Sequence, residues 1–333
     1  MTKAASDHAL VCHHLAPGLA GLALQPLAAP APGPGQVAVR VHAAALNFPD
    51  LLMTRGGYQH KPALPYTVGM EGAGEVCALG PGVSGVALGQ RVCFGGKEGA
   101  VAQQAVVPVA ALRPWPRGFD AAEAAAYWVC ASTAWVALVV RGQLQRGEVL
   151  LVHGASGGTG AAAVQLGRHL GARVIATGTS AERLAPAAGL GAALLLTTGG
   201  GFRAAVKAFG GGRGADVVFD PVGGDVFDES VHCIAPDGRL LVVGFTGGRV
   251  ASVATNLVLI KSFSVVGVRA GEYLRNHPDR EPAIIERIAR LPEEGDFRPL
   301  IGARYPLAQA MAAMQALLER RVPGKVVVEM PLP

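Results

Sequence analysis

The sequence predicts an α/β protein in which a doubly wound parallel sheet is combined with a smaller β-domain. From residue 149 onward, apolar runs alternate with helical segments, which is the pattern of parallel strands joined by crossover helices. The first 113 residues instead show short β-like runs separated by turns rich in Gly and Pro. A last β-like run, 325–329, is expected to return to the β-domain, so the chain crosses the domain boundary twice.

Composition limits the classes of function. The chain has 333 residues, of which 50% are hydrophobic and 16% charged, so one very large domain or two ordinary ones can form. The net charge of +5 is spread along the chain, which argues against a nucleic-acid partner and favours anionic ligands only mildly. Five scattered cysteines without a C-x-x-C pair indicate reduced thiols and a cytoplasmic location. We find no membrane-spanning apolar run and no secretory signal.

The N-terminal region reads as a compact, curved β-domain. Strands are expected near 10–45, followed by Asn47–Met53 and a Gly-rich loop at 55–58. Glycines inside the run 66–76 indicate bulges or a close approach of the backbone.

Helices and strands alternate after this region. Asp120 is an expected N-cap with Glu123 three residues later, and a second helical stretch is expected at about 131–142. Residues 263–268, the last expected strand of the parallel sheet, form an apolar edge, which suggests a homodimer that pairs through this strand. Helices near 281–291 and 307–320 precede the final strand. The six expected strands are 149–153, 173–177, 193–197, 216–219, 239–244 and 263–268.

The stretch 149–160 indicates dinucleotide binding. An apolar strand ends in His153-Gly154-Ala155-Ser156-Gly157-Gly158-Thr159-Gly160, and an Ala-rich helix follows. Ala155 stands where the usual motif has its first glycine, so the form is A-x-G-G-x-G. The small residues let a pyrophosphate reach the helix N-terminus, where free N–H groups and the helix dipole bind anions. The expected contacts are Ser156, Gly157, Gly158 and Thr159.

The residues after the second strand favour NADPH over NADH. An NAD-binding protein places an acid at this point for the ribose hydroxyls, whereas this chain has Gly178-Thr179-Ser180. Ser180 can donate a hydrogen bond and Arg183 a charge-assisted pair to a 2′-phosphate. Arg183 as a solvated helix residue is the alternative.

The order of several motifs resembles the zinc-free quinone oxidoreductases of the medium-chain dehydrogenase/reductase superfamily. The resemblance implies a GroES-like catalytic domain at 1–125, a Rossmann NADP-binding domain at 126–268 and a return to the catalytic domain at 269–333. It also implies hydride transfer from a nicotinamide held between the domains. The motifs that carry it are 47–50 (NFPD), 69–74 (GMEGAG), 154–160 (GASGGTG), 219–224 (FDPVGG), 238–245 (GRLLVVGF) and 324–327 (GKVV).

The sequence argues against zinc. Compared with the zinc-dependent branch, the chain has Asn47 in place of the first cysteine ligand and Met70 in place of the histidine before Glu71. Cys130 falls one residue away from the third ligand position, and the four-cysteine structural zinc lobe is missing. Without a Lewis acid to stabilise an alkoxide, alcohol oxidation is disfavoured, and hydride transfer to a quinone or conjugated carbonyl remains.

The resemblance also suggests roles for residues in the β-domain. Asn47 and Thr133 are expected near the nicotinamide, where they would orient the ring or bind the substrate carbonyl; Asn47 as a turn former is the alternative. Tyr58 either donates to a quinone oxygen or forms a pocket wall. Lys325 either reaches the cofactor or caps the strand edge.

Two further residues have expected structural roles, and two others are expected at the cofactor. Asp50 is expected to anchor its loop and Glu71 to form an ion pair in the β-domain. Phe245 and Val268 follow strand ends, where ligands collect in open sheets, and core residues are the alternative interpretation. The final proton is expected to come from water, because no acid–base pair stands out.

Two other functions stay open at this point. One is an enoyl-thioester reductase of the acryloyl-CoA type, which shares the architecture. The other is a non-catalytic NADPH-binding protein. The expected partners are therefore a small electrophile, NADPH and a second copy of the chain.

Overall fold

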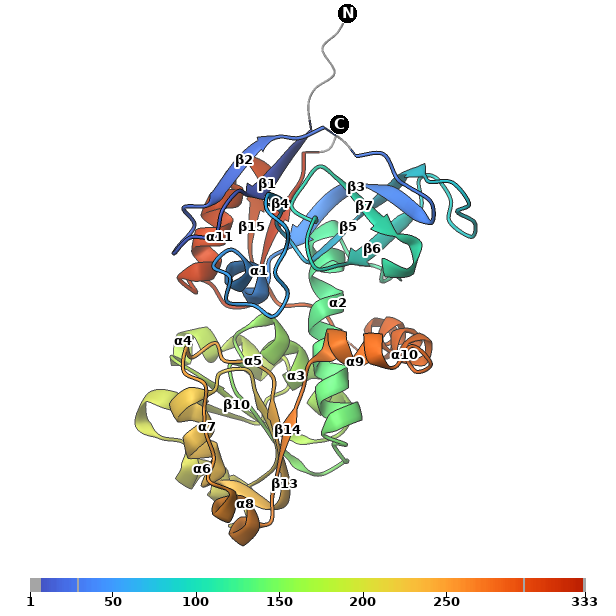
Figure 1. Cartoon of the computed structure of the whole chain (residues 1–333). Coiled ribbons are helices and arrows are strands. Elements are labelled where there is room, and N and C mark those ends of the chain that lie inside the picture. The colour runs from blue at the N-terminus through green and yellow to red at the C-terminus, as the bar shows by residue number, and fades with distance from the viewer. Residues whose placement is uncertain (1–6, 29, 296, 332–333) are drawn as a thin grey trace, which may run out of the picture. The chain divides into compact units, whose positions relative to one another are not determined.

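The computed structural model describes residues 7–28, 30–295 and 297–331, and it divides into two compact units (Figure 1). Unit 1 comprises Met1–Val129 and Ile301–Pro333, and unit 2 comprises Cys130–Leu300. Residues 269–300 therefore lie with the parallel sheet, whereas the sequence pattern had placed them in the catalytic domain. One reason is that Gln165 holds this segment by two hydrogen bonds, from its Nε2 to Arg298 O (2.9 Å) and from Arg298 N to its Oε1 (3.0 Å).

Unit 1 is the expected β-domain. One sheet has the order β2-β1-β4, and the other has the order β15-β16-β3-β5-β6-β8, with β7 also pairing with β3. The final strand pairs antiparallel with β3 from Val327 opposite Ala45 onward, which confirms its return to this domain. The strands are β1 His8–Cys12, β2 Leu22–Pro26, β3 Gln36–Ala45, β4 Tyr66–Thr67, β5 Glu71–Leu79, β6 Arg91–Gly95, β7 Gln104–Pro108, β8 Leu112–Pro114, β15 Ile301–Pro306 and β16 Lys325–Glu329.

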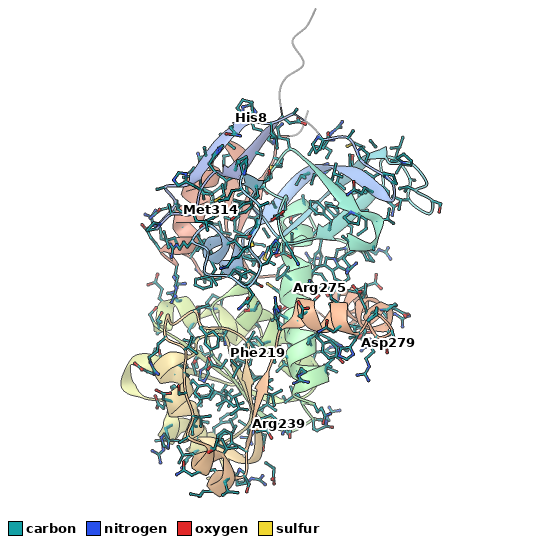
Figure 2. All side chains as sticks on the ribbon, viewed as in Figure 1. His8, Phe219, Arg239, Arg275, Asp279 and Met314 are labelled. Carbon is teal, nitrogen blue, oxygen red and sulfur yellow. The ribbon has the colours of Figure 1, made fainter. Side chains whose placement is uncertain are left out.

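Two helices complete the core of unit 1. Helix α1 (Phe48–Met53) follows β3, and helix α11 (Ala310–Leu318) packs on β15 and β16. Met314, labelled in Figure 2, is fully buried on α11 against this core. In β5, a Cβ on Gly74 would lie 2.0 Å from Arg40 O, so glycine there permits the close strand approach that the sequence indicated.

The two helical stretches expected at 119–142 form one continuous helix. Helix α2 (Ala121–Trp135) continues directly into a π-helical segment, Val136–Arg141. Asp120 and Glu123 form the expected capping box, with Asp120 N donating to Glu123 Oε2 and Glu123 N donating to Asp120 Oδ1. An 18-residue window of this 21-residue helix has a mean hydropathy of 1.4, which makes the helix a candidate membrane span that was not predicted from the sequence. A buried share of 67% fits a core helix.

Unit 2 is a six-stranded parallel sheet of order β11-β10-β9-β12-β13-β14, which confirms the doubly wound parallel sheet that the sequence predicts. The expected strands are confirmed within two residues except for β13, which begins five residues early. Its register shifts across Pro236-Asp237-Gly238, which resembled a turn in the sequence. The strands are β9 Val149–Val152, β10 Arg173–Gly178, β11 Leu194–Thr197, β12 Ala215–Asp220, β13 Ile234–Val242 and β14 Ser264–Gly267.

Helices cover both faces of this sheet. Leu151, Ile175 and Val218 contribute to a core that α6, α7 and α8 cover. On the other face α3 packs closely, because a Cβ on Gly167 would lie 2.5 Å from Leu150 Cδ2. The helices are α3 Gly158–His169, α4 Ala181–Leu184, α5 Pro186–Gly189, α6 Arg203–Phe209, α7 Gly224–Val231, α8 Thr255–Lys261, α9 Ala270–Asn276 and α10 Glu281–Glu294.

Candidate cofactor and active site

The turn after β9, residues 154–160, allows close approach to a helix N-terminus, and we call it the phosphate turn. Gly154 has φ +58°, in the left-handed region that favours glycine. A Cβ on Gly160 would lie 2.2 Å from Gly154 O, so this position also requires glycine. The role of Gly154 was not predicted, because the motif was aligned on Ala155 in the sequence.

The phosphate turn fits a pyrophosphate. Gly157 is the N-cap of α3, and the N–H groups of the first helical turn have no acceptor within the helix. A Cβ on Gly157 would meet only Gly154 O, at 3.4 Å, so open space adjoins this residue. Ser156, Gly158 and Thr159 are partly exposed beside it.

The turn after β10 carries the residues expected to read the 2′-phosphate. Gly178 ends the strand, and Ser180 is the N-cap of α4, whose Oγ accepts from Arg183 N at 3.3 Å. Accepting this bond leaves the Ser180 hydroxyl hydrogen able to donate to a ligand. Arg183 is partly exposed on α4, and the exposed Glu182 is the acid nearest to Ser180 in the chain.

Phe245 and Val268 follow β13 and β14 at the same edge of the sheet, as expected. Phe245 is 41% exposed, and a Cβ on Gly223 would lie 3.0 Å from its Cδ1. Val268 is buried and its N–H donates to Val242 O. Unit 2 thus brings the predicted residues after β9, β10, β13 and β14 to the carboxyl edge of one sheet, where open α/β sheets bind ligands.

Unit 1 contains a buried polar group that we call the Lys325 cluster, formed by Asn47, Asp50, Glu71 and Lys325. The Lys325 ammonium lies 2.6 Å from Asn47 Oδ1 and 2.9 Å from Glu71 Oε1. Glu71 Oε2 accepts from Val129 N at 3.0 Å. Glu71 is 1% exposed, so the ion pair expected for it is confirmed and lies almost entirely out of water.

The amide of Asn47 is held by this cluster. Its two Nδ2 hydrogens have acceptors in Glu71 Oε1 (3.0 Å) and Ala45 O (3.1 Å). Its Oδ1 accepts from Lys325 and retains a second lone pair. Asn47 is therefore able to orient or accept from a ligand, whereas donation to a substrate carbonyl would break an existing hydrogen bond.

Asp50 anchors the start of α1, as expected. Its Oδ2 accepts from Asn47 N at 2.8 Å, while its buried Oδ1 has no hydrogen-bond partner among the described residues. Burial raises the pKa of this carboxyl to about 7, against the opposing effects of the Asn47 amide and the Lys325 charge.

The other two predicted residues lie in different units. Tyr58, in unit 1, is partly buried and packs against the hydrophobic core, which is compatible with either role considered for it. Thr133, in unit 2, is partly buried on α2. The catalytic roles of Asn47, Tyr58 and Thr133 stay predictions.

The positions that correspond to zinc ligands do not form a metal site. Asn47 Oδ1 is bound by the Lys325 ammonium, and Met70 offers only a thioether. Across residues 7–28, 30–295 and 297–331, no three His, Cys, Asp or Glu side chains come together as a metal-binding group. Asn47 and Met70 thus differ from the cysteine and histidine donors that are typical of a catalytic zinc site.

Comparisons with known proteins identify the family. Residues 33–117 match the alcohol dehydrogenase GroES-like domain, and residues 158–290 match the zinc-binding dehydrogenase model. Quinone oxidoreductase-like protein 2 of Mus musculus is 36% identical over 311 residues, which cover 93% of this chain and 89% of the relative. This chain belongs to the zinc-free quinone oxidoreductase family of the medium-chain dehydrogenase/reductase superfamily.

Two further relatives are a quinone oxidoreductase whose structure includes a complex with NADPH and a polyketide synthase system protein. The quinone oxidoreductase from Thermus thermophilus, solved also in complex with NADPH, is 34% identical with a TM-score of 0.83, covering 97% of this chain and 99% of its own. The spectinabilin polyketide synthase system protein NorB of Streptomyces orinoci is 38% identical over 313 residues. These cover 93% of this chain but 14% of that larger protein.

Proposed function

We propose that this protein is an NADPH-dependent oxidoreductase that transfers a hydride to a quinone or another conjugated carbonyl compound without a metal ion. The observation that carries the proposal is the Lys325 ammonium, which binds Asn47, at the position of the first cysteine ligand of the zinc-dependent branch, and Glu71, the residue after the position of its histidine ligand. Similarity to the NADPH-binding quinone oxidoreductase of Thermus thermophilus supports the cofactor and the reaction class.

The chain's own residues have four tasks in this proposal. The phosphate turn binds the pyrophosphate, and Ser180 with Arg183 binds the 2′-phosphate. Lys325 and Glu71 fix the Asn47 amide, whose second Oδ1 lone pair serves as an acceptor for the ligand. When bound, NADPH supplies the hydride, and a proton from water completes reduction of the quinone to hydroquinone.

A substrate panel tests the proposal. NADPH oxidation is measured with small quinones, enones and enoyl-CoA thioesters, and separately with NADH as the donor. The proposal expects turnover of quinones or enones, preference for NADPH, and no change in rate after dialysis against a metal chelator. Loss of activity on chelation, or a preference for NADH, contradicts it.

An enoyl-thioester reductase is the second candidate. It is favoured by the 38% identity to the polyketide synthase protein, because such assemblies act on thioester-bound chains. Faster turnover of crotonyl-CoA than of any quinone in the panel supports this function instead. Tight NADPH binding without turnover of any compound supports the non-catalytic alternative.

We also propose a cytoplasmic homodimer. All five cysteines are free thiols, which suits a reducing compartment. Strand β14 lies at the end of its sheet, with Val265 39% exposed, so a second copy can extend the sheet there. Val265→Lys is expected to shift the elution volume in size-exclusion chromatography from dimer to monomer. A wild-type protein that elutes as a monomer contradicts this part of the proposal.

A further inference from the structure

A buried histidine stands directly before the phosphate turn, and the sequence pattern assigned no role to it. His153 follows β9, and its backbone N–H donates to the backbone oxygen of Phe219, which is labelled in Figure 2. Its ring is fully buried and lies 5.1 Å from the ring of Phe202, centroid to centroid. A buried imidazole requires partners for both nitrogens, so its surroundings define what it does.

Both ring nitrogens have hydroxyl partners. Thr177 Oγ1 lies 2.7 Å from Nδ1, and Ser230 Oγ lies 2.7 Å from Nε2. Ser230 already donates its only hydroxyl hydrogen to Val226 O, at 2.7 Å. Ser230 must therefore accept from Nε2–H, which leaves Nδ1 to accept from the Thr177 hydroxyl.

We call Thr177, His153 and Ser230 the His153 chain. It runs in one direction from Thr177 through the imidazole to α7, with every hydroxyl and ring nitrogen satisfied. Burial lowers the pKa of the imidazole to about 3, so the ring is neutral near pH 7.

The His153 chain ties together the two turns that meet the cofactor. His153 immediately precedes Gly154 of the phosphate turn. Thr177 immediately precedes Gly178, the last residue of β10 before the turn that carries Ser180 and is expected to bind the 2′-phosphate. The backbone oxygen of Thr177 also accepts from Ala155 N, inside the phosphate turn, at 3.0 Å. Thr177 thus contacts both the residue before the phosphate turn and a residue within it.

We infer that His153 is a positioning residue for NADPH, because it fixes the spacing between the turn that binds the pyrophosphate and the turn that binds the 2′-phosphate. The inference rests on the NADPH of the proposed function. NADPH contacts both turns. NADH has no 2′-phosphate, so its binding depends mainly on the phosphate turn. A change in the spacing of the two turns is therefore expected to weaken the binding of NADPH more than the binding of NADH.

The test separates an effect of His153 on the spacing of the two turns from an effect on the stability of the protein. His153→Phe keeps an aromatic ring but leaves the hydroxyl hydrogen of Thr177 without its acceptor and Ser230 without its donor. The triple variant H153F/T177V/S230A also removes both hydroxyls, so no buried polar group is left unpaired and the thermal midpoint is expected to recover. NADPH and NADH affinities are measured by fluorescence titration, alongside the thermal midpoint of each variant.

The inference expects NADPH affinity to fall by about 10-fold or more in both variants, since the loss of one hydrogen bond to a charged phosphate costs about a factor of 10 in affinity. The ratio of NADPH to NADH affinity should fall with it. A triple variant that regains both stability and wild-type NADPH affinity overturns the inference, because His153 would then serve only the core.

Cys233→Ala is the matched control. Cys233 is fully buried in the same core, which contains Phe202, and it is remote in sequence from both turns. This variant should lower the thermal midpoint and leave NADPH affinity unchanged, and an equal loss of affinity also overturns the inference. Failure of the proposed reaction is distinguishable, since it would appear as wild-type NADPH binding without turnover of quinones or enones.

Discussion

The Lys325 cluster of unit 1 and the His153 chain of unit 2 are two buried polar groups organised in opposite ways. The cluster is ionic: it holds an ammonium and a carboxylate, and Asp50 Oδ1 has no partner among the described residues. The His153 chain is neutral, and each of its side-chain polar atoms has a partner. Buried charge makes the cluster sensitive to any single substitution, whereas the neutral chain gives rigidity at a smaller electrostatic cost.

Removing the ammonium should produce the largest effect. Lys325→Met leaves Glu71 buried without its counter-charge, and breaking a buried pair in this way costs about 3–5 kcal/mol of unfolding free energy. Urea unfolding measures the loss. The double variant K325M/E71Q should recover part of it, because the uncompensated charge is gone. A loss below about 1 kcal/mol in the single variant would show that the pair contributes little.

The contributions of Asp50 and His153 to the free energy of unfolding should change with pH in opposite directions. The pKa of Asp50 is 3.8 when unfolded and about 7 when folded, so between these values the folded state binds the extra proton and stability falls as pH rises. The pKa of His153 is 6.5 when unfolded and about 3 when folded, so the unfolded state binds the proton and stability rises with pH.

Asp50→Asn and His153→Gln separate these contributions. Relative to wild type, between about pH 4.5 and about pH 6 the first variant should make the slope of unfolding free energy against pH more positive. The second should make it more negative, each by up to about 1.4 kcal/mol per pH unit. Urea unfolding at several pH values measures both slopes. Slopes that change in the same direction would contradict the assigned protonation states.

Ser230→Ala should have a smaller effect than loss of the ammonium. The change removes the acceptor of His153 Nε2–H and leaves a buried donor unpaired, which costs about 1–3 kcal/mol. Thermal unfolding monitored by circular dichroism measures it. Thr177→Val, at the other end of the His153 chain, is the matched comparison, since it leaves the Nδ1 acceptor unpaired. No loss in either variant would mean that these hydrogen bonds add little to stability.

An exposed ionic group gives the smallest expected effect. Arg304 bridges Asp120 (2.6 Å) and Glu329 (3.0 Å), but all three side chains are more than 40% exposed. Water and salt screen such pairs, so Arg304→Ala should cost less than about 1 kcal/mol, and added salt should reduce the loss further. A loss as large as that of Lys325→Met would show that burial is not what distinguishes the Lys325 cluster.

Much of the fold followed from local patterns. The six strands of unit 2 are visible in the sequence as apolar runs followed by small residues, and Asp120 with Glu123 marks the start of α2. The start of strand β13 was the exception, because its Pro-Asp-Gly sequence is typical of a turn, and the early part of the strand belongs to the sheet through the pairing of Ile234 with Ala215 of β12. Residues 269–300 were assigned to the wrong unit for a similar reason: the hydrogen bonds between Gln165 and Arg298 join residues 133 positions apart.

The sequence by itself determined the family, the doubly wound parallel sheet and the small residues of the phosphate turn. The family depends on the order of short motifs, the sheet on the alternation of apolar and helical segments, and the turn on residues with little or no side chain. Tertiary structure alone decided how the polar residues are used. Lys325 meets Asn47 across 278 residues, and His153 meets Ser230 across 77. Hydrogen bonds of this range arise only when strands and helices pack, since no local pattern specifies which distant partner a buried polar group will find.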